Sequence, residues 1–367
     1  MTWNQASCAE LNFAFLLVYA AFALCIVEDF GGGHRSRSAR VTILSKRRSE
    51  WVVSRAVALT VLLLAAASLG LSISPALATT KITLLYVPIN PFAGSWIAKD
   101  QGYFEKHGLD VDLILAPSGG GAISGLIAGS AQIGVTTPSQ LLQADEQGLD
   151  LVILAGTTVF PVTPHSTGVL ARSNSDIKTV TDLIGKKVAM GGFGSATDVI
   201  AKKWVQSNGL DYHNVKWVEI QFPQMGDALK AGLVDAVVST NPFQSRILAN
   251  NIGYEVVDLN SVPYKGTMST AYISTRSWAL KNAETISAFR AALDEATDYL
   301  NEPTQTDSIR ATIAKYSKLP PEIVATLPIP TNVDAHAKPE GMAFWIEASR
   351  EQGLITGNPD PASLIAP

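Results

Sequence analysis

The sequence predicts an α/β protein of two lobes, in which each lobe is a mostly parallel sheet flanked by helices and the chain crosses between the lobes twice. The main observation is an internal repeat of a Gly-Leu-Asp turn, an apolar run, a helix end and a second apolar run. The first copy covers residues 108–115, 126–129 and 133–138, and the second covers 209–211, 215–220, 229–232 and 236–242. In both copies the last strand runs into a hydroxyl-rich turn ended by proline, where open α/β sheets bind their ligands. Two such lobes facing each other would form a cleft.

The first lobe begins with a strand at residues 81–87, where β-branched and apolar residues dominate. Residues 93–106 have the apolar spacing of a helix that carries Trp96 and Phe104 inward. The remaining elements are strands at 111–115, 133–136 and 151–155, a helix that ends at residue 128 and a helix at 139–147. Their alternation predicts a parallel sheet covered by helices.

The second lobe is entered by an extended run at residues 168–172, and a second extended run at 269–275 predicts the return crossing. Helices are predicted after that return, at 283–300, 307–316, 321–326 and 339–352. The expected segments are an N-terminal extension and signal at 1–78, the first part of lobe one at 79–170, lobe two at 171–268, and the return to lobe one with the C-terminal helices at 269–367. Two crossings between lobes form a hinge, and hinged lobes close around ligands.

Charge and cysteine content exclude several classes of function. Of the 28 Lys and Arg and the 32 Asp and Glu, seven and four precede residue 79, which leaves a net charge of −7 on residues 79–367. That charge argues against nucleic acid or an anionic membrane surface as a partner. Both cysteines, Cys8 and Cys25, also precede residue 79, so the body can form neither a disulfide nor a thiolate site. The five histidines lack the spacing of metal ligands, and we predict no metal and no cofactor.

The N-terminal segment predicts export. Basic residues at 46–48 precede an apolar stretch at 56–71 and the tetrapeptide PALA at 75–78, which is the order of a secretory signal with its cleavage site. We therefore predict cleavage after Ala78 and a periplasmic body, with a membrane anchor as the alternative. Another apolar stretch at 11–27 comes first, so either translation starts downstream or this stretch spans the membrane. Both cases place the basic segment between the two apolar stretches, residues 34–55, in the cytoplasm and export the body.

Four strings of the sequence resemble one family of receptors. They are AKDQGYFEKHGLDV at residues 98–111, GSAQIG at 129–134, TDLIGKKVA at 181–189 and GLVDA at 232–236. In this order they are similar to the type II periplasmic substrate-binding proteins of ABC importers, in particular the receptors for aliphatic sulfonates, taurine, nitrate and thiamine precursors. The resemblance implies a monomeric receptor that binds a small sulfonate, taurine, nitrate or pyrimidine-like solute in its cleft. It also implies docking on a permease in the inner membrane.

A glycine-rich turn is the strongest candidate for solute binding. Residues 191–197 (GGFGSAT) follow a predicted strand and open a helix. Gly194 lets the backbone approach a ligand, the free N–H groups of a helix N-terminus carry partial positive charge, and Ser195 and Thr197 add hydroxyl donors. The alternative is a plain helix start with Ser195 as its N-cap. Asp198 in the first turn would repel a multiply charged ligand.

Matched turns in the two copies of the repeat supply further candidates. Thr137 and Ser139 follow the last strand of the first copy, and Ser239 and Asn241 end that of the second. Because they occupy the same place in each copy, we expect them to face the cleft from opposite sides, although ordinary turn chemistry selects the same residue types. These turns contain neither Lys nor Arg, so neutral donors would have to hold an anionic solute. The sequence is therefore also compatible with a neutral or aromatic solute.

The end of the first strand offers an amide and an aromatic wall. Asn90, Phe92 and Trp96 lie there, and we expect them to contact the solute. The alternative for Trp96, which lies on a predicted helix, is a place in the hydrophobic core.

Two other classes of function fit the sequence less well. An enzyme on the same two-lobed fold, such as a hydrolase or a pyrimidine synthase, is the main alternative, but we predict no catalytic residues. The body contains no G-x-S-x-G nucleophile elbow. The sequence does not exclude a catalytic Ser–His–Asp arrangement that includes His165. The effector domain of a transcription regulator shares the architecture but would need an N-terminal helix-turn-helix. Sequence does not separate a transport receptor from a sensor that presents its loaded form to a membrane kinase.

Overall fold

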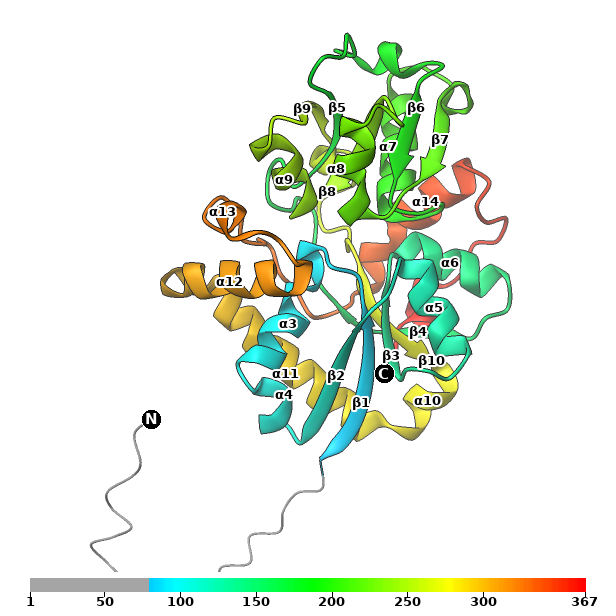
Figure 1. Ribbon diagram of the computed structural model, residues 1–367. Helices are drawn as coiled ribbons and strands as arrows, with labels where there is room; N and C mark the ends of the chain where they lie inside the picture. Colours follow the sequence, from blue (N-terminus) through cyan, green and yellow to red (C-terminus); the bar gives the residue numbers. More distant parts are fainter. Residues whose placement is uncertain (1–78) are drawn as a thin grey trace, which may run out of the picture. The chain divides into compact units, whose positions relative to one another are not determined.

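The computed structural model describes residues 79–367. The predicted cleavage site after Ala78 and the apolar stretches at 11–27 and 56–71 lie outside the described residues. The described chain forms two lobes, each with its own five-stranded sheet (Figure 1). In this part of the chain no helix combines the length and the apolar content that a membrane crossing requires.

The first sheet has the strand order β2-β1-β3-β10-β4. Strand β1 (Thr80–Tyr86) pairs in parallel with β2 (Leu109–Leu115) and with β3 (Ile133–Thr136). Strand β10 (Ala271–Thr275) returns from the second lobe and pairs antiparallel with both β3 and β4 (Leu151–Gly156). Strands β3 and β4 are buried along their whole length. Strand β3 lies at the centre of the sheet, which is covered on both faces, and the edge strand β4 is covered near the C-terminus, where Ile153 bridges to Ile365.

Helices cover the first sheet, and several of them begin near its cleft edge. They are η2 (Asn90–Phe92), α3 (Ala93–Asp100), α4 (Tyr103–Lys106), α5 (Gly119–Ile127) and α6 (Pro138–Glu146). The single helix predicted at 93–106 is therefore wrong. Gly102, which separates α3 from α4, has a φ of 74°, a left-handed conformation that ends a helix and that glycine adopts without strain. Both Trp96 and Phe104 are fully buried, as predicted.

The second sheet has the strand order β7-β6-β8-β5-β9. Its strands are β5 (Thr167–Arg172), β6 (Lys187–Met190), β7 (Lys216–Glu219), β8 (Ala236–Thr240) and β9 (Gly253–Asp258). Its helices are α7 (Ala196–Ser207), α8 (Phe222–Lys230) and α9 (Phe243–Ala249), with short 3-10 turns η3 (Val180–Leu183), η4 (Tyr212–Asn214) and η5 (Leu259–Ser261). Strand β5 pairs with β8 from its first residue, Thr167. The chain therefore enters the second lobe before Thr167, and the boundary expected after residue 170 cuts through this strand.

The two sheets have the same arrangement, which explains the internal repeat. Strands β2, β1 and β3 of the first sheet correspond in order to β7, β6 and β8 of the second. In each sheet a crossing strand follows, β10 or β5, and then an edge strand, β4 or β9. The crossing strands, β10 and β5, are antiparallel to both of their neighbours. The carboxyl ends of the repeated strands thus face the junction between the lobes, as expected for a ligand-binding α/β pair.

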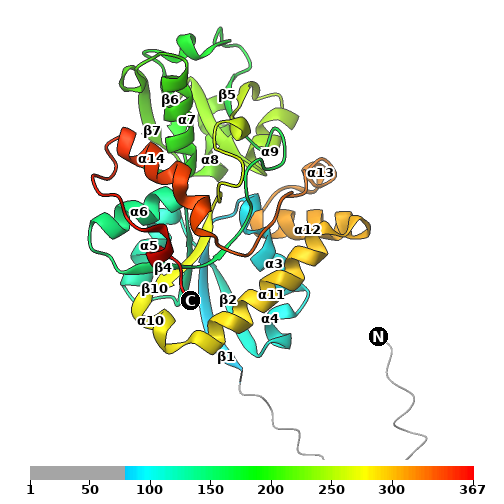
Figure 2. The same cartoon turned by 180° about the vertical axis from the view of Figure 1, so that it is seen from behind.

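The C-terminal part of the chain adds helices to the first lobe and a bridge to the second. The elements are α10 (Arg276–Lys281), α11 (Ala283–Asn301), η6 (Pro303–Gln305), α12 (Thr306–Ser317), α13 (Pro321–Val324), η7 (Pro339–Met342), α14 (Ala343–Glu351) and η8 (Pro361–Leu364). Helix α14 packs on α6 of the first lobe and on α7 of the second (Figure 2). Just after α14, Gln352 Nε2 donates to the carbonyl of Val199 in α7 at 2.9 Å. The segment expected to belong to the first lobe therefore also contacts the second.

Candidate functional site

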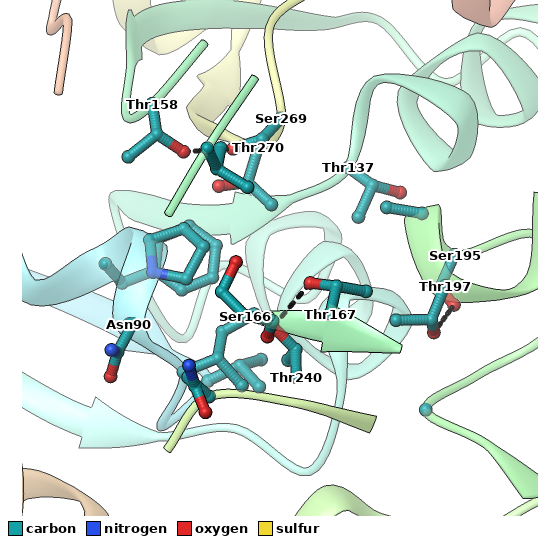
Figure 3. Close-up of a pocket in the computed structure, with 18 of the residues that line it drawn as sticks. Asn90, Thr137, Thr158, Ser166, Thr167, Ser195, Thr197, Thr240, Ser269 and Thr270 are labelled. Atoms are coloured by element: carbon teal, nitrogen blue, oxygen red, sulfur yellow. Dashed lines mark hydrogen bonds between the residues drawn. The ribbon is translucent and has the colours of Figure 1, made fainter. Parts of the chain in front are cut away.

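A cavity of about 90 Å³ lies at the junction of the two lobes (Figure 3). Both lobes line it, and so do the two crossings between them. Its polar lining residues are Asn90, Ser118, Thr136, Thr137, Gln140, Thr158, Thr163, Ser166, Thr167, Ser195, Thr197, Thr240, Asn241, Ser269, Thr270 and Thr331. Its apolar lining residues include Val87, Ile89, Phe92, Val135, Phe160, Val162, Ile200, Phe222 and Pro330. The cavity is thus rich in hydroxyl groups and has a partly aromatic wall.

Every residue that lines the cavity is uncharged. Three helices nevertheless begin there, because the N-caps of α5, α6 and α7 are Ser118, Thr137 and Ser195, and all three line the cavity. Each cap accepts only one N–H of its helix, so other N–H groups of the first turn have no partner within the helix. Helix N-termini carry partial positive charge. The cavity therefore combines neutral side chains with backbone donors, a combination suited to a polar or singly charged solute.

Hydroxyl groups in the cavity are arranged in pairs. Ser195 Oγ lies 3.1 Å from Thr197 Oγ1, and Thr167 Oγ1 lies 2.9 Å from Thr240 Oγ1. In Figure 3, Ser195 and Thr197 lie on the opposite side of the view from Asn90, with the Thr167 and Thr240 pair between them. A hydroxyl can both donate and accept, so each pair can turn its proton toward the other hydroxyl or toward a solute. Ser195 is both the N-cap of the alternative interpretation and a residue of the cavity.

A buried ion pair supports the start of α7. Asp198 Oδ2 accepts the N–H of Gly194 at 2.8 Å and the Nζ of Lys202 at 2.9 Å. Asp198 has no exposed surface and Lys202 is 8% exposed. Burial raises the pKa of the Asp198 carboxyl, against the opposing effect of the Lys202 ammonium and the Gly194 N–H. The pair carries no net charge when both groups are ionised, and it fixes the glycine-rich turn from within the second lobe.

The structure brings six of the ten predicted site residues to the cavity. These are Asn90, Phe92, Thr137, Ser195, Thr197 and Asn241. They come from both lobes, as the matched positions of the turns predict. The backbone N–H of Asn90 donates to the carbonyl of Asn241 at 2.9 Å, so the lobes meet directly beside the cavity.

The other four predicted residues, Trp96, Ser139, Gly194 and Ser239, do not line the cavity. Trp96 is fully buried in the first lobe, where its ring stacks on Tyr316 with centroids 5.6 Å apart and an interplanar angle of 12°. The core alternative is therefore the correct one for Trp96. Ser239 is fully buried in β8, within the core of the second lobe.

Ser139 and Gly194 contact each other instead of the cavity. Ser139 Oγ, from α6 of the first lobe, donates to the carbonyl of Gly194, from the glycine-rich turn of the second, at 2.7 Å. The sequence predicted that Ser139 would face the Ser239 and Asn241 turn, whereas its hydroxyl contacts the glycine-rich turn and leaves the cavity to neighbouring residues. The physical reason is the N-cap role of Thr137, which starts α6 and turns the next polar side chain toward the other lobe.

Sequence reasoning missed the hydroxyl groups that the crossings contribute. Thr158, from the first crossing, lies with Ser269 of the second, and their hydroxyl oxygens are 2.5 Å apart. Thr270 also lines the cavity from the second crossing. The signal was present, because the crossings around residues 157–167 and 266–270 are rich in Ser and Thr, but they contain no motif and no strand end. Pro330 and Thr331, which follow α13, also line the cavity, and no sequence pattern indicated that they would.

The charged side chains and the histidines of residues 79–367 lie outside the cavity lining. Within residues 79–367 no cluster of His, Cys, Asp and Glu has the arrangement of a metal site. His165 is exposed, and its Nδ1 lies 2.6 Å from Glu255 Oε1. It does not line the cavity, so the geometry does not bring it to a serine there.

Comparisons with known proteins agree with the geometry. The model of the family described as NMT1/THI5 like matches residues 90–306. The formylaminopyrimidine-binding protein of Halalkalibacterium halodurans is 26% identical over 221 residues, which cover 59% of this chain and 65% of that protein, just under two thirds of its length.

Solved structures share the fold. The periplasmic aliphatic sulphonate binding protein SsuA from Escherichia coli has a TM-score of 0.64 at 25% identity, over 78% of this chain and 97% of that chain. The periplasmic nitrate-binding protein NrtA from Synechocystis PCC 6803 has a TM-score of 0.67 at 16% identity, over 77% of this chain and 84% of that chain. The predicted two-lobed α/β fold of the periplasmic binding proteins is thus confirmed.

Proposed function

The chain belongs to the NMT1/THI5-like family, and from that premise we propose that it is an extracytoplasmic solute-binding receptor of an ABC importer. It binds a small organic or oxyanion solute between its lobes, closes by hinge bending and delivers the solute to a permease in the inner membrane. The receptor acts as a monomer in the periplasm. Names of related proteins and structures, which refer to binding of formylaminopyrimidine, sulphonate and nitrate, support this class of solute.

The observation that carries the proposal is a single cavity lined by both lobes and both crossings. A solute held by Thr137 in the first lobe and by Ser195 and Thr197 in the second would link the lobes. Its binding energy would then favour the closed conformation over an open one, so that solute binding would close the hinge. The same solute would be released when the lobes separate.

The lining also supports binding without chemistry. Among the residues around the cavity there is no carboxylate, imidazole or amine to act as an acid or base, and the hydroxyl groups have no such partner to activate them. The hydroxyl pairs and the N-termini of α5, α6 and α7 instead provide donors for an acceptor-rich solute. The walls formed by Phe92, Phe160 and Phe222 accommodate an apolar part of an organic solute.

A thermal-shift screen tests this function. The probes are alkanesulfonates, taurine, nitrate, bicarbonate, aminopyrimidines and aromatic carboxylates. At a hundred times its Kd a ligand adds about 2.7 kcal/mol of stability, which raises the midpoint by several degrees. A shift with one chemical class supports the receptor and identifies its solute. Hydrolysis or conversion of any probe by the protein would contradict a receptor role.

A further inference from the structure

We propose that Ser139 and Asp198 are positioning residues for solute binding, which act through the backbone of Gly194 and do not touch the solute. This inference rests on the proposed function, since it identifies a contact that helps to hold the lobes closed around the cavity. It gives a role to two of the predicted residues, Ser139 and Gly194, that lie outside the cavity lining.

The carbonyl of Gly194 receives hydrogen bonds from the opposite lobe. Ser139 Oγ donates to it at 2.7 Å, and Gln143 Nε2, one turn further along α6, approaches it at 3.4 Å. Gln143 Nε2 also donates to the carbonyl of Ser139 at 3.0 Å, which ties both donors to the same turn of α6. Ser139 has no exposed surface, so water does not compete for its hydroxyl while the lobes are in contact.

The N–H side of the same residue is fixed within the second lobe. Gly194 donates its N–H to the buried carboxylate of Asp198 at 2.8 Å, and Lys202 holds that carboxylate from one turn further along α7. Gly194 has a φ of 68°, which most residues adopt only with strain. A Cβ atom added at Gly194 would lie 2.1 Å from Gln143 Nε2, so the end of that side chain would have to move.

The hydrogen bond from Ser139 Oγ to the Gly194 carbonyl, with Gly194 held by Asp198, forms a contact between the lobes directly beside the solute site. We call this contact the latch. Ser195, the next residue after Gly194, lines the cavity, and so does Thr137, two residues before Ser139. The Ser139 to Gly194 hydrogen bond therefore sets the spacing between the two N-caps that face the solute. Loss of this bond would separate the lobes at that point and weaken solute binding without removing any group that contacts the solute.

The test measures the distance between the lobes by electron spin resonance. Spin labels are attached to Ala128→Cys in the first lobe and Lys216→Cys in the second, both exposed, in the full chain with Cys8 and Cys25 replaced by Ser. Ser139→Ala should move the open-to-closed ratio about fivefold toward the open form, the effect of one lost buried hydrogen bond.

Ser274→Ala is the matched control, because Ser274 Oγ is also a fully buried hydroxyl that donates to a carbonyl, that of Gln132, at 2.6 Å within the first lobe. It should leave the distance distribution unchanged. If Ser139→Ala and Ser274→Ala give the same distribution, the proposal is overturned.

The role of Asp198 is tested with the charge of Lys202 removed. Asp198→Asn with Lys202→Met keeps an oxygen that can accept the Gly194 N–H, whereas Asp198→Ala with Lys202→Met does not. The Asn variant should retain the closed distribution and the Ala variant should lose it, and equal distributions would refute the positioning role. If the Ser139→Ala variant binds solute and the distance between the lobes is unchanged, the positioning role of Ser139 is refuted while the proposed receptor function is supported.

Discussion

Replacing Lys202 by Met tests the buried ion pair that supports the glycine-rich turn. Lys202 Nζ lies 2.8 Å from Asp198 Oδ1, and the Asp198 side chain has no exposed surface. Without the ammonium, the Asp198 carboxylate keeps the hydrogen bond from the Gly194 N–H but has no opposite charge beside it among residues 79–367. Removing one member of a buried pair costs about 3–5 kcal/mol, because the remaining charge stays desolvated. We expect a loss of stability in that range at neutral pH.

The pH dependence has a definite sign. Burial already raises the pKa of Asp198, and loss of Lys202 removes a group that lowers it. A carboxyl whose pKa is higher in the folded than in the unfolded protein contributes stability that is fully present below the unfolded pKa and is lost as the pH rises through the folded pKa. The deficit of Lys202→Met should therefore be larger at neutral pH than near pH ~4, the ordinary pKa of an aspartate.

Urea unfolding of the variant and the wild type at both pH values measures this deficit. Lys81→Met is the matched control, since Lys81 pairs at 3.4 Å with Asp112 while the two side chains are 71% and 52% exposed. Exposed pairs contribute at most about 1 kcal/mol, so this control should change little at either pH. A Lys202→Met deficit no larger than that of Lys81→Met, or one that grows as the pH falls, would refute the reasoning.

Three further predictions concern the cavity lining, the core of the first lobe and an exposed ion pair. Ser195→Ala combined with Thr197→Ala should weaken solute binding by about 2 kcal/mol, measured by calorimetry with the solute from the thermal-shift screen, and an unchanged affinity would remove both residues from the site. Trp96→Ala should cost about 3–5 kcal/mol in urea unfolding while the folded protein binds solute as before; a selective loss of affinity would return Trp96 to the site. Glu255→Gln should lower the pKa of His165, which the Glu255 carboxylate raises by hydrogen bonding, and an NMR titration with an unshifted imidazole would contradict the pair.

Much of the fold follows from local patterns in the sequence. Apolar runs define the strands of the repeated unit, and the hydroxyl-rich turns after β3 and β8 place Thr137 and Asn241 at the junction of the lobes. The partners of the crossing strands do not follow from such patterns. Strand β5 belongs to the second sheet because it pairs with β8 and β9, and this pairing depends on residues that come much later in the chain.

Side-chain direction limits what the sequence predicts of the site. Trp96 is buried because Tyr316, from a distant helix, stacks on its ring. Ser139 points toward the other lobe because the phase of α6 is set by its cap at Thr137. Thr158 reaches the cavity from a crossing whose course only the tertiary fold determines. Thr137 and Asn241, just after strand ends, were therefore predictable, whereas the burial of Ser239 within β8 and residues placed by helix phase or by the hinge were not.

The position of a bound solute tests the central claim most directly. A crystal structure of the protein grown with the probe that gives the largest thermal shift would show it. The account predicts that the probe lies in the interlobe cavity, within hydrogen-bonding distance of Thr137 in one lobe and of Ser195 or Thr197 in the other. A probe bound outside that cavity, or held by one lobe alone in a closed protein, would contradict the proposal that the solute links the lobes.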